Sequence, residues 1–418
     1  MPKRPPRPEK PRRLKPRDTA RFGLGAVMLF EATCCLLLAV RSMPPDWVAL
    51  LLAVLLPALT YLTVRLVARR LGADAMLTML MNFLCALGII LLYGLSPERG
   101  IRQAWMYLGG LAMYAFCFLA VRTLRDVRAL SWLMIPAGLL LLVLPVVMGQ
   151  ETNGAKNWLA VPLIGSFQPS ELVKLLLLLV LAQSFSGMGR LRGMLPGLFF
   201  VAGCLVLLML QKDLGTALMY YLVTLLLFWA ASSNLLLTAL GAVGGMGAAY
   251  LGYMMFAHVK TRVAMWLNPW SDALGKGYQL VQALTAIASG GLFGVGLGMG
   301  QSRVIPAYST DFIFAVLCEQ FGILFGLCVL ALYAVIVMRG IALSMRAQEP
   351  FHALLALGIA LMIGLQTFTI IGGVIKLIPL TGITMPFVSY GGTSLVASMG
   401  MIGMLCGVAA GEKRQEGE

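Results

Sequence analysis

Residues 305–338 read IPAYSTDFIFAVLCEQFGILFGLCVLALYAVIVM, a polar segment that continues directly into a long apolar one. A helix needs about 20 apolar residues to cross the hydrocarbon core of a bilayer, and the apolar part exceeds that length. The same pattern recurs along the chain and predicts an all-α, polytopic transmembrane helical bundle with about 10 to 12 spans. The predicted spans are about 22–41, 47–67, 75–95, 103–121, 129–148, 169–187, 195–211, 214–231, 235–257, 312–338, 351–374 and 393–411.

The composition is that of a membrane protein. Of the 418 residues, 60% are hydrophobic and only 12% are charged, whereas about a quarter of a soluble globular protein is charged. The net charge of +15 is explained by basic cytoplasmic loops and by contact with anionic lipid. The sequence contains no nucleic-acid-binding motif, so we expect membrane lipid, and not nucleic acid, as a partner.

Clusters of lysine and arginine predict which side of the membrane each loop faces. With twelve spans, all of these clusters fall on one side, which the positive-inside rule assigns to the cytoplasm. Both termini are then cytoplasmic, and the segments 149–168, 258–311 and 375–392 lie outside. The clusters are the N-terminal tail, 65–70, 122–128, 190–192, 339–346 and 413–414.

Three parts of the chain are predicted. Residues 1–21 form a basic, proline-rich and disordered cytoplasmic tail, which lacks the cleavage site of a signal peptide. Residues 22–411 form the multi-span membrane domain, and residues 412–418 form a short cytoplasmic C-terminal tail. The eight cysteines lie in apolar segments, where we expect them to pack and not to form disulfides.

The longest predicted outer segment, 258–311, carries basic residues on the side of the membrane where they are uncommon. Lys260, Arg262 and Arg303 are three of them. In one interpretation they pair locally and contact lipid headgroups, and in another they form an outer site for an anionic lipid substrate. The glycine run 290–300 is not a nucleotide-binding loop, because such a loop lies between a strand and a helix in the cytosol. We expect a tightly packed re-entrant loop, since irregular backbone at membrane depth must be buried by protein or water.

Two polar islands interrupt the apolar sequence. The first island is 305–314 and the second island is 379–392. Asp311 in the first island is predicted to be the catalytic centre, because an acidic side chain at the lip of a span is costly and usually functional. The alternative is a helix N-cap. Glu319 lies about 12 Å deeper along the same helix, where it either supports the structure or tunes Asp311.

Polar residues at the ends of other predicted spans have competing interpretations. Glu171 and Lys174 are i,i+3 neighbours that form an internal ion pair at the start of a helix, or else Lys174 lies beside a functional cavity. Asp213, between two spans, is predicted to be a helix N-cap. The two histidines lie on different segments and no group has zinc-ligand spacing, so no metal site is predicted from the residues.

Taken by themselves, these features predict a multi-span protein with an outward-facing polar cavity, an acid at its lip and basic residues around it. This arrangement suits an enzyme that acts on an extracytoplasmic lipid-linked anion. It suits a transporter or flippase of such a molecule equally well, and the choice between them rests on motifs shared with a known family.

The matching segments are 153–158, 168–174, 213–216, 277–279, the glycine run from Ser289, 310–314 and 379–392. In this order they resemble the SEDS family (shape, elongation, division and sporulation), whose members include RodA, FtsW and SpoVE. The resemblance covers roughly residues 149–410. The family usually has ten spans, so either an extra helical pair lies within 22–121 or this region is divided too finely.

The resemblance implies a peptidoglycan glycosyltransferase in the bacterial cytoplasmic membrane. Such an enzyme polymerises lipid II, a disaccharide-pentapeptide on undecaprenyl pyrophosphate, at the outer face during elongation, division or sporulation. It typically pairs with a class B penicillin-binding protein. The family's essential acid maps onto Asp311 and its outer-loop tryptophan onto Trp158. Asp311 would act as a general base, or it would position the hydroxyl or bind a divalent cation, Mg or Mn, that bridges the pyrophosphate.

The other candidate residues either bind the substrate or support the site. Those predicted to bind it, chiefly through charge-assisted contacts to the pyrophosphate, are Lys156, Trp158, Lys174, Lys260, Arg262, Gln279 and Arg303. Those predicted to support the site are Glu171, Asp213, Glu319 and Ser389. The chain departs from the family's usual residues at Asn157, Lys212, Ala307, Ser309, Gln320 and Lys376, but it keeps the central acid. A lipid II flippase and a non-catalytic scaffold for a penicillin-binding protein are the alternatives.

Overall fold

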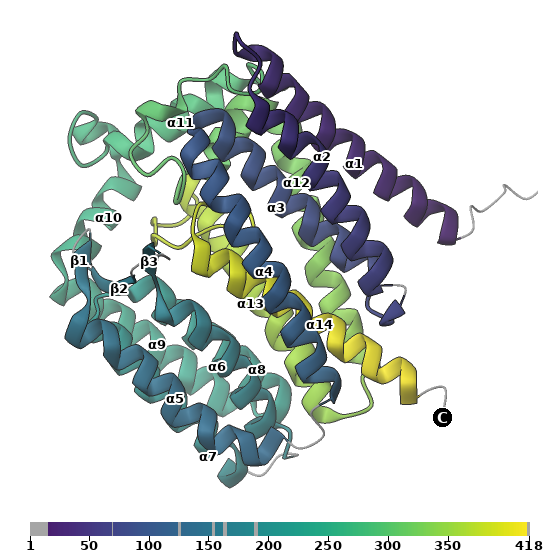
Figure 1. The fold of residues 1–418 in the computed structure, drawn as a ribbon. Helices are drawn as coiled ribbons and strands as arrows, with labels where there is room; N and C mark the ends of the chain where they lie inside the picture. The colour runs from purple at the N-terminus through teal and green to yellow at the C-terminus, as the bar shows by residue number, and fades with distance from the viewer. Residues whose placement is uncertain are drawn as a thin grey trace, which may run out of the picture.

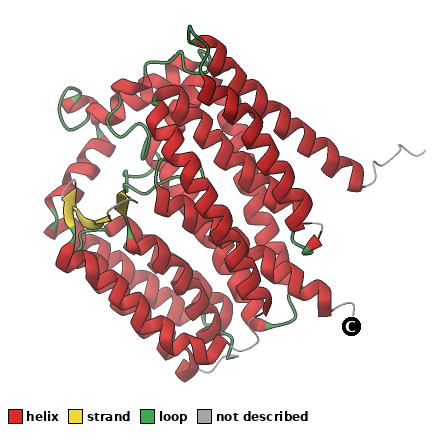
Figure 2. Ribbon diagram, in the orientation of Figure 1, coloured by secondary structure: helices red, strands yellow, loops and turns green. Residues whose placement is uncertain are grey.

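The computed structural model describes residues 16–68, 70–123, 127–152, 155–161, 165–187 and 191–415. Most of these residues lie in long helices that run side by side (Figure 1, Figure 2), which confirms the all-α prediction. The long helices are α1 (Pro16–Arg41), α2 (Trp47–Leu62), α3 (Ala75–Leu95), α4 (Pro97–Thr123), α5 (Val127–Met148), α6 (Pro169–Phe185), α7 (Leu191–Leu210), α8 (Leu214–Ser232), α9 (Leu235–Met255), α12 (Ile313–Arg346), α13 (Pro350–Val374) and α14 (Gly392–Gln415). The shorter helical elements are η1 (Thr63–Ala68), α10 (Ala257–Leu267), η2 (Pro269–Asp272), α11 (Tyr278–Gly290) and η3 (Ser302–Val304).

Each of the twelve predicted spans coincides with one of the long helices. Eleven helices in the described ranges are long and apolar enough to cross a membrane, and α6, with 17 residues, is the remaining predicted span. Two helices extend past the predicted boundaries. α1 begins at Pro16, inside the segment 1–21 that was expected to be disordered, and α14 extends to Gln415, past the predicted end at 411. A helix satisfies its own backbone hydrogen bonds, so it can continue into polar sequence where hydropathy no longer marks it. Residues 1–15 lie outside the described residues.

The centre of the bundle is formed by α3, α13 and α14, in which most residues are buried. α4 packs along α14. A Cβ atom on Gly403 or Gly407 of α14 would lie 2.3 Å from the carbonyl oxygen of Tyr114 or 2.8 Å from that of Phe118, both in α4. Glycines therefore let these two helices approach closely, as small residues do in membranes. All eight cysteines are free and seven are buried, as expected for packing residues.

A small antiparallel sheet, which the sequence did not predict, follows α5. Its strands β1 (Gln150–Thr152), β2 (Ala155–Val161) and β3 (Gly165–Phe167) pair in the order β1-β2-β3. The backbone N–H of Lys156 in β2 donates to the carbonyl of Gln211 (3.0 Å), which ties the sheet to the segment between α7 and α8. Strands this short carry too few residues for an alternating hydrophobic pattern to be recognised.

The glycine run 290–300 packs against a break in α12. The break lies at Gly322, whose φ is +86°. The backbone N–H groups of Val295 and Gly296 donate to the carbonyls of Glu319 and Gln320, at 2.9 and 3.0 Å. In return, the N–H of Ile323 on the far side of the break donates to the glycine run, at Gly291 (2.9 Å). The run thus satisfies backbone groups that the break exposes, which confirms the tightly packed loop predicted here.

Replacing Gly322 by alanine is expected to destabilise the fold. The new Cβ would lie 2.2 Å from the carbonyl oxygen of Leu292 at a residue with positive φ, so we expect a loss of at least about 2 kcal/mol. Thermal unfolding of the purified protein in detergent micelles measures this loss. Gly244→Ala in α9 is the matched control, because nothing lies within 4 Å of its Cβ position. Equal melting temperatures for the two variants would contradict the packing described.

The two polar islands join into one unit at the same end of the bundle. The backbone N–H of Tyr390 in the second island donates to the carbonyl of Ser309 in the first (2.8 Å). Beside it, the hydroxyl of Ser389 donates to the carbonyl of Thr310 (2.7 Å) and accepts the backbone N–H of Met385 (2.8 Å). The side chain of Gln103 in α4 donates to the carbonyl of Ser389 (3.0 Å). Ser389 therefore holds the residue that precedes Asp311.

Removing the Ser389 hydroxyl is expected to loosen this junction. Ser389→Ala leaves a buried carbonyl and a buried N–H without their partner, which costs about 1 to 3 kcal/mol. Ser398→Ala is the matched control, since the Ser398 hydroxyl is also buried but has no hydrogen-bond partner among the described residues. Denaturation in detergent should therefore show a clear loss for Ser389→Ala and a change within about 0.5 kcal/mol for the control. A similar loss in both variants would refute the role given to Ser389.

Candidate functional site

Asp311 lies in the second half of the first island, two residues before α12 begins at Ile313. The N-cap position of α12 belongs to Phe312, and no side chain caps the helix there. The structure therefore does not support the interpretation of Asp311 as a helix N-cap. Burial of this half-buried side chain raises the pKa of Asp311 above its usual value, although a hydrogen bond with Thr310 and the charge of Arg262 act in the opposite direction. A carboxylate with a raised pKa is a stronger base than an ordinary aspartate.

Arg262 on α10 brings three distant segments together. Its guanidinium donates to the carbonyl of Thr381 in the second island (2.6 Å). Its charge also interacts with the carboxylates of Asp311 and Asp213. Gly382, which follows Thr381 with a φ of +76°, leaves room for the guanidinium, because a Cβ there would lie 3.0 Å from it. Arg262 is thus the predicted basic residue that the structure places with the central acid.

Asp213 is a helix N-cap, as predicted, and it has further contacts. Its carboxylate accepts the backbone N–H of Thr216 in the first turn of α8 (3.1 Å) and the Thr216 hydroxyl (3.0 Å). The side-chain amides of Asn157 in β2 and Gln168 at the start of α6 also donate to it, at 3.0 and 3.2 Å. Asp213 therefore fixes the sheet, α6 and α8 relative to one another. Trp158 follows Asn157 in β2 and is half-buried.

Glu171 and Lys174 form the internal ion pair that was one of their two predicted interpretations. The ammonium group of Lys174 lies 2.7 Å from the Glu171 carboxylate and 3.0 Å from the side-chain oxygen of Gln366 in α13, and both charged residues are buried. The amide of Gln366 donates in turn to the carbonyl of Thr384 in the second island (2.8 Å). The contacts of Lys174 therefore favour a structural role, in which it supports the second island through Gln366.

The contacts of Glu319 are also structural. Its buried carboxylate accepts the backbone N–H groups of Gln301 and Ser302, at 2.9 and 3.0 Å, at the end of the glycine run. It is not among the groups that shift the pKa of Asp311. Of the two predicted roles, the contacts favour support of the fold over tuning of Asp311.

Within the described ranges, none of the other predicted substrate-binding residues is among the side chains that interact with Asp311. The side chains of Lys156, Lys260 and Gln279 are exposed and form no hydrogen bond or ion pair with another residue in the described ranges. Arg303 lines a cavity that does not include Asp311 or Arg262. Asn153 and Gly154, the first two residues of the matching segment 153–158, lie outside the described residues.

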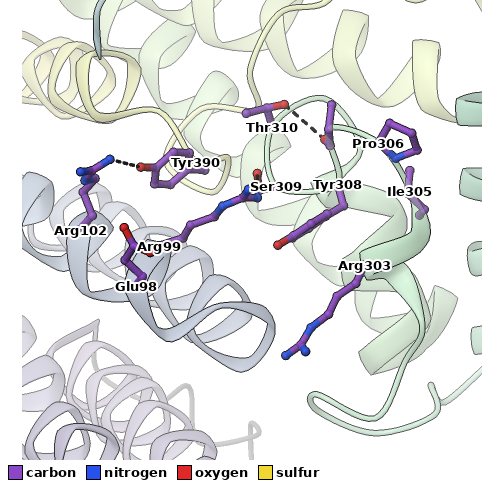
Figure 3. A pocket seen from close by; sticks show the side chains of 11 residues that line it. Glu98, Arg99, Arg102, Arg303, Ile305, Pro306, Tyr308, Ser309, Thr310 and Tyr390 are labelled. Carbon is purple, nitrogen blue, oxygen red and sulfur yellow. Dashed lines mark hydrogen bonds between the residues drawn. The ribbon is translucent and has the colours of Figure 1, made fainter. Parts of the chain in front are cut away.

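This cavity, of about 630 Å³, is lined by two arginines that the sequence reasoning missed (Figure 3). Arg99 and Arg102 come from the first turns of α4, and Arg303 comes from the segment before the first island. A signal for the two missed residues was present. In the predicted topology, the segment between the predicted spans 75–95 and 103–121 lies outside, and it carries both arginines against the positive-inside trend.

Comparison with known proteins identifies the family. Residues 74–414 match the cell cycle protein family of FtsW, RodA and SpoVE. The chain is 32% identical to peptidoglycan glycosyltransferase RodA of Mycobacterium tuberculosis, over 82% of this chain and 79% of that protein. It is 32% identical to stage V sporulation protein E of Bacillus subtilis, over 82% of this chain and 98% of that protein.

The fold is similar to that of a solved structure described as "structural coordination of polymerization and crosslinking by a peptidoglycan synthase complex". The similarity has a TM-score of 0.69 at 29% identity and covers 82% of this chain and 98% of that chain. α1 and α2 precede the matched residues and account for the extra helical pair. The other ten predicted spans lie within the match. The chain therefore belongs to the family of FtsW, RodA and SpoVE, as the SEDS resemblance predicted.

Proposed function

We propose that this peptidoglycan glycosyltransferase polymerises lipid II into glycan strands, with Asp311 as its general base. The observation that carries the proposal is the position of Asp311, which is half-buried at the junction of the two polar islands and interacts with Arg262. The raised pKa of Asp311 suits proton abstraction, because a base works best when its pKa approaches the working pH. Arg262 supplies positive charge at the same place.

The proposed reaction is an inverting displacement. The oxygen of an acceptor sugar hydroxyl forms a bond to the anomeric carbon of the donor, while the bond from that carbon to the lipid diphosphate breaks. The hydroxyl proton passes to Asp311, and the electron pair leaves with the diphosphate. Positive charge from Arg262 would stabilise the charge that develops on the leaving group. An inverting displacement with a diphosphate leaving group needs no second catalytic carboxylate. Glu319 and Asp213 instead accept hydrogen bonds from backbone and amide donors.

The chain is a multi-pass membrane protein, and we place the island end of the bundle at the outer face of the bacterial cytoplasmic membrane. The support is the distribution of lysine and arginine, which puts both termini in the cytoplasm. α10, α11 and both islands then form an outer layer over the spans. Lipid II exposed at that face would reach Asp311 without crossing the membrane again.

A class B penicillin-binding protein is the proposed partner. The support is the similar chain from a structure described as coordinating polymerization and crosslinking in a peptidoglycan synthase complex. Polymerisation at the outer face supplies glycan strands, and crosslinking consumes them. A partner with crosslinking activity alone would therefore complement this chain.

A divalent cation, Mg²⁺ or Mn²⁺, is the alternative role for Asp311. Within the described ranges, no three histidine, cysteine or acidic side chains are grouped as ligands. Mg²⁺ nevertheless often binds through one or two carboxylates together with substrate phosphates. Asp311 would be the protein ligand and the lipid diphosphate would supply the others, so that the ion neutralises charge on the leaving group. Chelation by EDTA separates this role from that of a base.

The proposed base is tested by Asp311→Asn. We expect polymerisation of labelled lipid II to fall about 100-fold or more, because an amide cannot take the hydroxyl proton. The assay uses the purified protein with its co-expressed partner, which must carry no glycosyltransferase domain. Asp272→Asn, an exposed acid in the same outer segment, is the matched control and should retain activity. Equal polymer from Asp311→Asn and wild type would eliminate Asp311 as the base, and loss of wild-type activity in EDTA would favour the cation.

Arg262→Gln tests the electrostatic link to Asp311. The Arg262 charge lowers the pKa of Asp311, and the base must be ionised to act, so the rate should rise with pH through that pKa. Removing the charge raises the pKa further, and the acidic limb of the pH–rate profile should move to higher pH. Lys276→Gln removes an exposed charge from the same outer segment without touching Asp311 and should leave the limb unchanged. An unchanged acidic limb of the pH–rate profile in Arg262→Gln would contradict an electrostatic effect of Arg262 on Asp311.

A further inference from the structure

The helical pair formed by α1 and α2 precedes the residues that match the family. The two helices pack on each other, and the buried carboxylate of Glu31 in α1 accepts a hydrogen bond from the hydroxyl of Thr60 in α2 (2.9 Å). α1 also packs against α3. Figure 1 shows the pair along one edge of the bundle, next to α3. The pair is thus an ordered addition to the matched bundle.

An aromatic cluster joins the helical pair to both sides of the break in α12. The ring centroid of Phe30 in α1 lies 6.0 Å from that of Phe321 and 5.7 Å from that of Phe325. Phe321 directly precedes Gly322, and Phe325 follows it within one turn. Aromatic rings at these distances attract one another. α1 therefore contacts the two parts of α12 that the break separates.

The last residue of α1, Arg41, holds the glycine run at Gly298. Its guanidinium donates a hydrogen bond to the carbonyl of Gly298, and no backbone N–H in the described ranges donates to that oxygen. The N–H of Gly298 donates to the side-chain oxygen of Gln320 (3.1 Å), just before the break. Gly298 has a φ of +70°, and a Cβ atom there would overlap the Arg41 guanidinium. Gly298 is therefore held on one side by α12 and on the other by the helical pair.

The turn between α1 and α2 fixes the end of α1. The carboxylate of Asp46, which caps α2, accepts a hydrogen bond from the hydroxyl of Tyr93 in α3 (2.5 Å). A Cβ atom on Gly94, the next residue of α3, would lie 3.3 Å from the side chain of Leu38 in α1 and 3.9 Å from the Cα atom of Gly298. α1, α3 and the glycine run therefore meet at one closely packed point.

Short connections link the position of Gly298 to the first island. The N–H groups of residues 301 and 302 donate to the carboxylate of Glu319, at 2.9 and 3.0 Å. The N–H of Ile305, the first residue of the island, donates to the carbonyl of residue 302 (3.0 Å). Asp311 follows in the same island. A shift of the glycine run would therefore also move the segment that carries Asp311.

We propose that Arg41 is a positioning residue for Asp311, and that the helical pair holds the glycine run so that the first island presents this carboxylate to the acceptor hydroxyl. The inference rests on the proposed function, in which Asp311 takes the hydroxyl proton. Arg41 is not among the groups that interact with Asp311, and it acts through Gly298. A base must lie within hydrogen-bond reach of its proton, and a displacement of about 1 Å can lower the rate about 100-fold.

The test compares three variants of the full-length protein with wild type. Arg41→Met removes the guanidinium and keeps an unbranched side chain, and Arg41→Lys keeps a charged donor. Arg122→Met is the matched control at the opposite end of the bundle. Arg122 is also an exposed arginine in the last turn of a helix, and it donates to a backbone carbonyl, that of Leu71 (2.9 Å). Melting temperatures in detergent show whether the three variants are folded.

Two quantities are measured, amide hydrogen exchange of residues 297–311 by mass spectrometry, and kcat and KM for lipid II in the polymerisation assay. In Arg41→Met we expect exchange in this segment to rise about tenfold or more, because a hydrogen bond from a charged group is lost. We expect kcat to fall about tenfold or more while KM stays within about twofold. Arg41→Lys should restore most of both values, and Arg122→Met should behave like wild type.

Unchanged exchange or unchanged kcat in Arg41→Met, or an equal fall of kcat in Arg122→Met, would overturn the positioning role. If wild type makes no polymer, the proposed function fails. Faster exchange of residues 297–311 in Arg41→Met, and not in Arg122→Met, would then still support the hold of Arg41 on this segment.

Gly298→Ala reaches the same contact from the other side, since its Cβ atom would displace the Arg41 guanidinium. If both variants act through this contact, Gly298→Ala combined with Arg41→Met should lower kcat no more than Gly298→Ala alone. Additive losses would show that the two residues act separately and would contradict the proposal.

Discussion

Backbone hydrogen bonding in a medium without water is the constraint on which this fold depends. α12 breaks at Gly322, and the glycine run 290–300 supplies partners for the backbone groups around the break. The end of the run is held in turn by Glu319, through the N–H groups of Gln301 and Ser302. The first island begins only three residues after Ser302. The backbone contacts that satisfy the break in α12 therefore also help to fix the segment that leads to Asp311.

Two aspartates interact with Arg262, and their surroundings give them different roles. Asp213 accepts four hydrogen bonds, from Asn157, Gln168 and Thr216, so its carboxylate is occupied in holding the sheet and two helices. Asp311 is held mainly through its backbone neighbours, and burial dominates its pKa. Environment, not residue type, thus separates the structural acid from the proposed base.

Features with a local signature could be predicted from the sequence. The apolar spans, the Asp213 cap, the pairing of Glu171 with Lys174 and the packed glycine run all depend on residues close together in the chain. Contacts between distant segments could not be predicted, such as those of Arg99 with Ser309 and of Arg262 with Thr381. The direction of the Asp311 pKa shift was also out of reach, because it depends on how much water the folded chain excludes.

α1 and α2 lie outside the family match, yet they contact the part of the bundle that carries the break. Phe30 of α1 stacks on Phe325 of α12, with ring centroids 5.7 Å apart, and Arg41 donates a hydrogen bond to the carbonyl of Gly298 in the glycine run. The matched region alone would present this face to the lipid. In this chain the helical pair occupies that part of the perimeter, so acyl chains and the membrane anchor of any associated protein must use the remaining circumference.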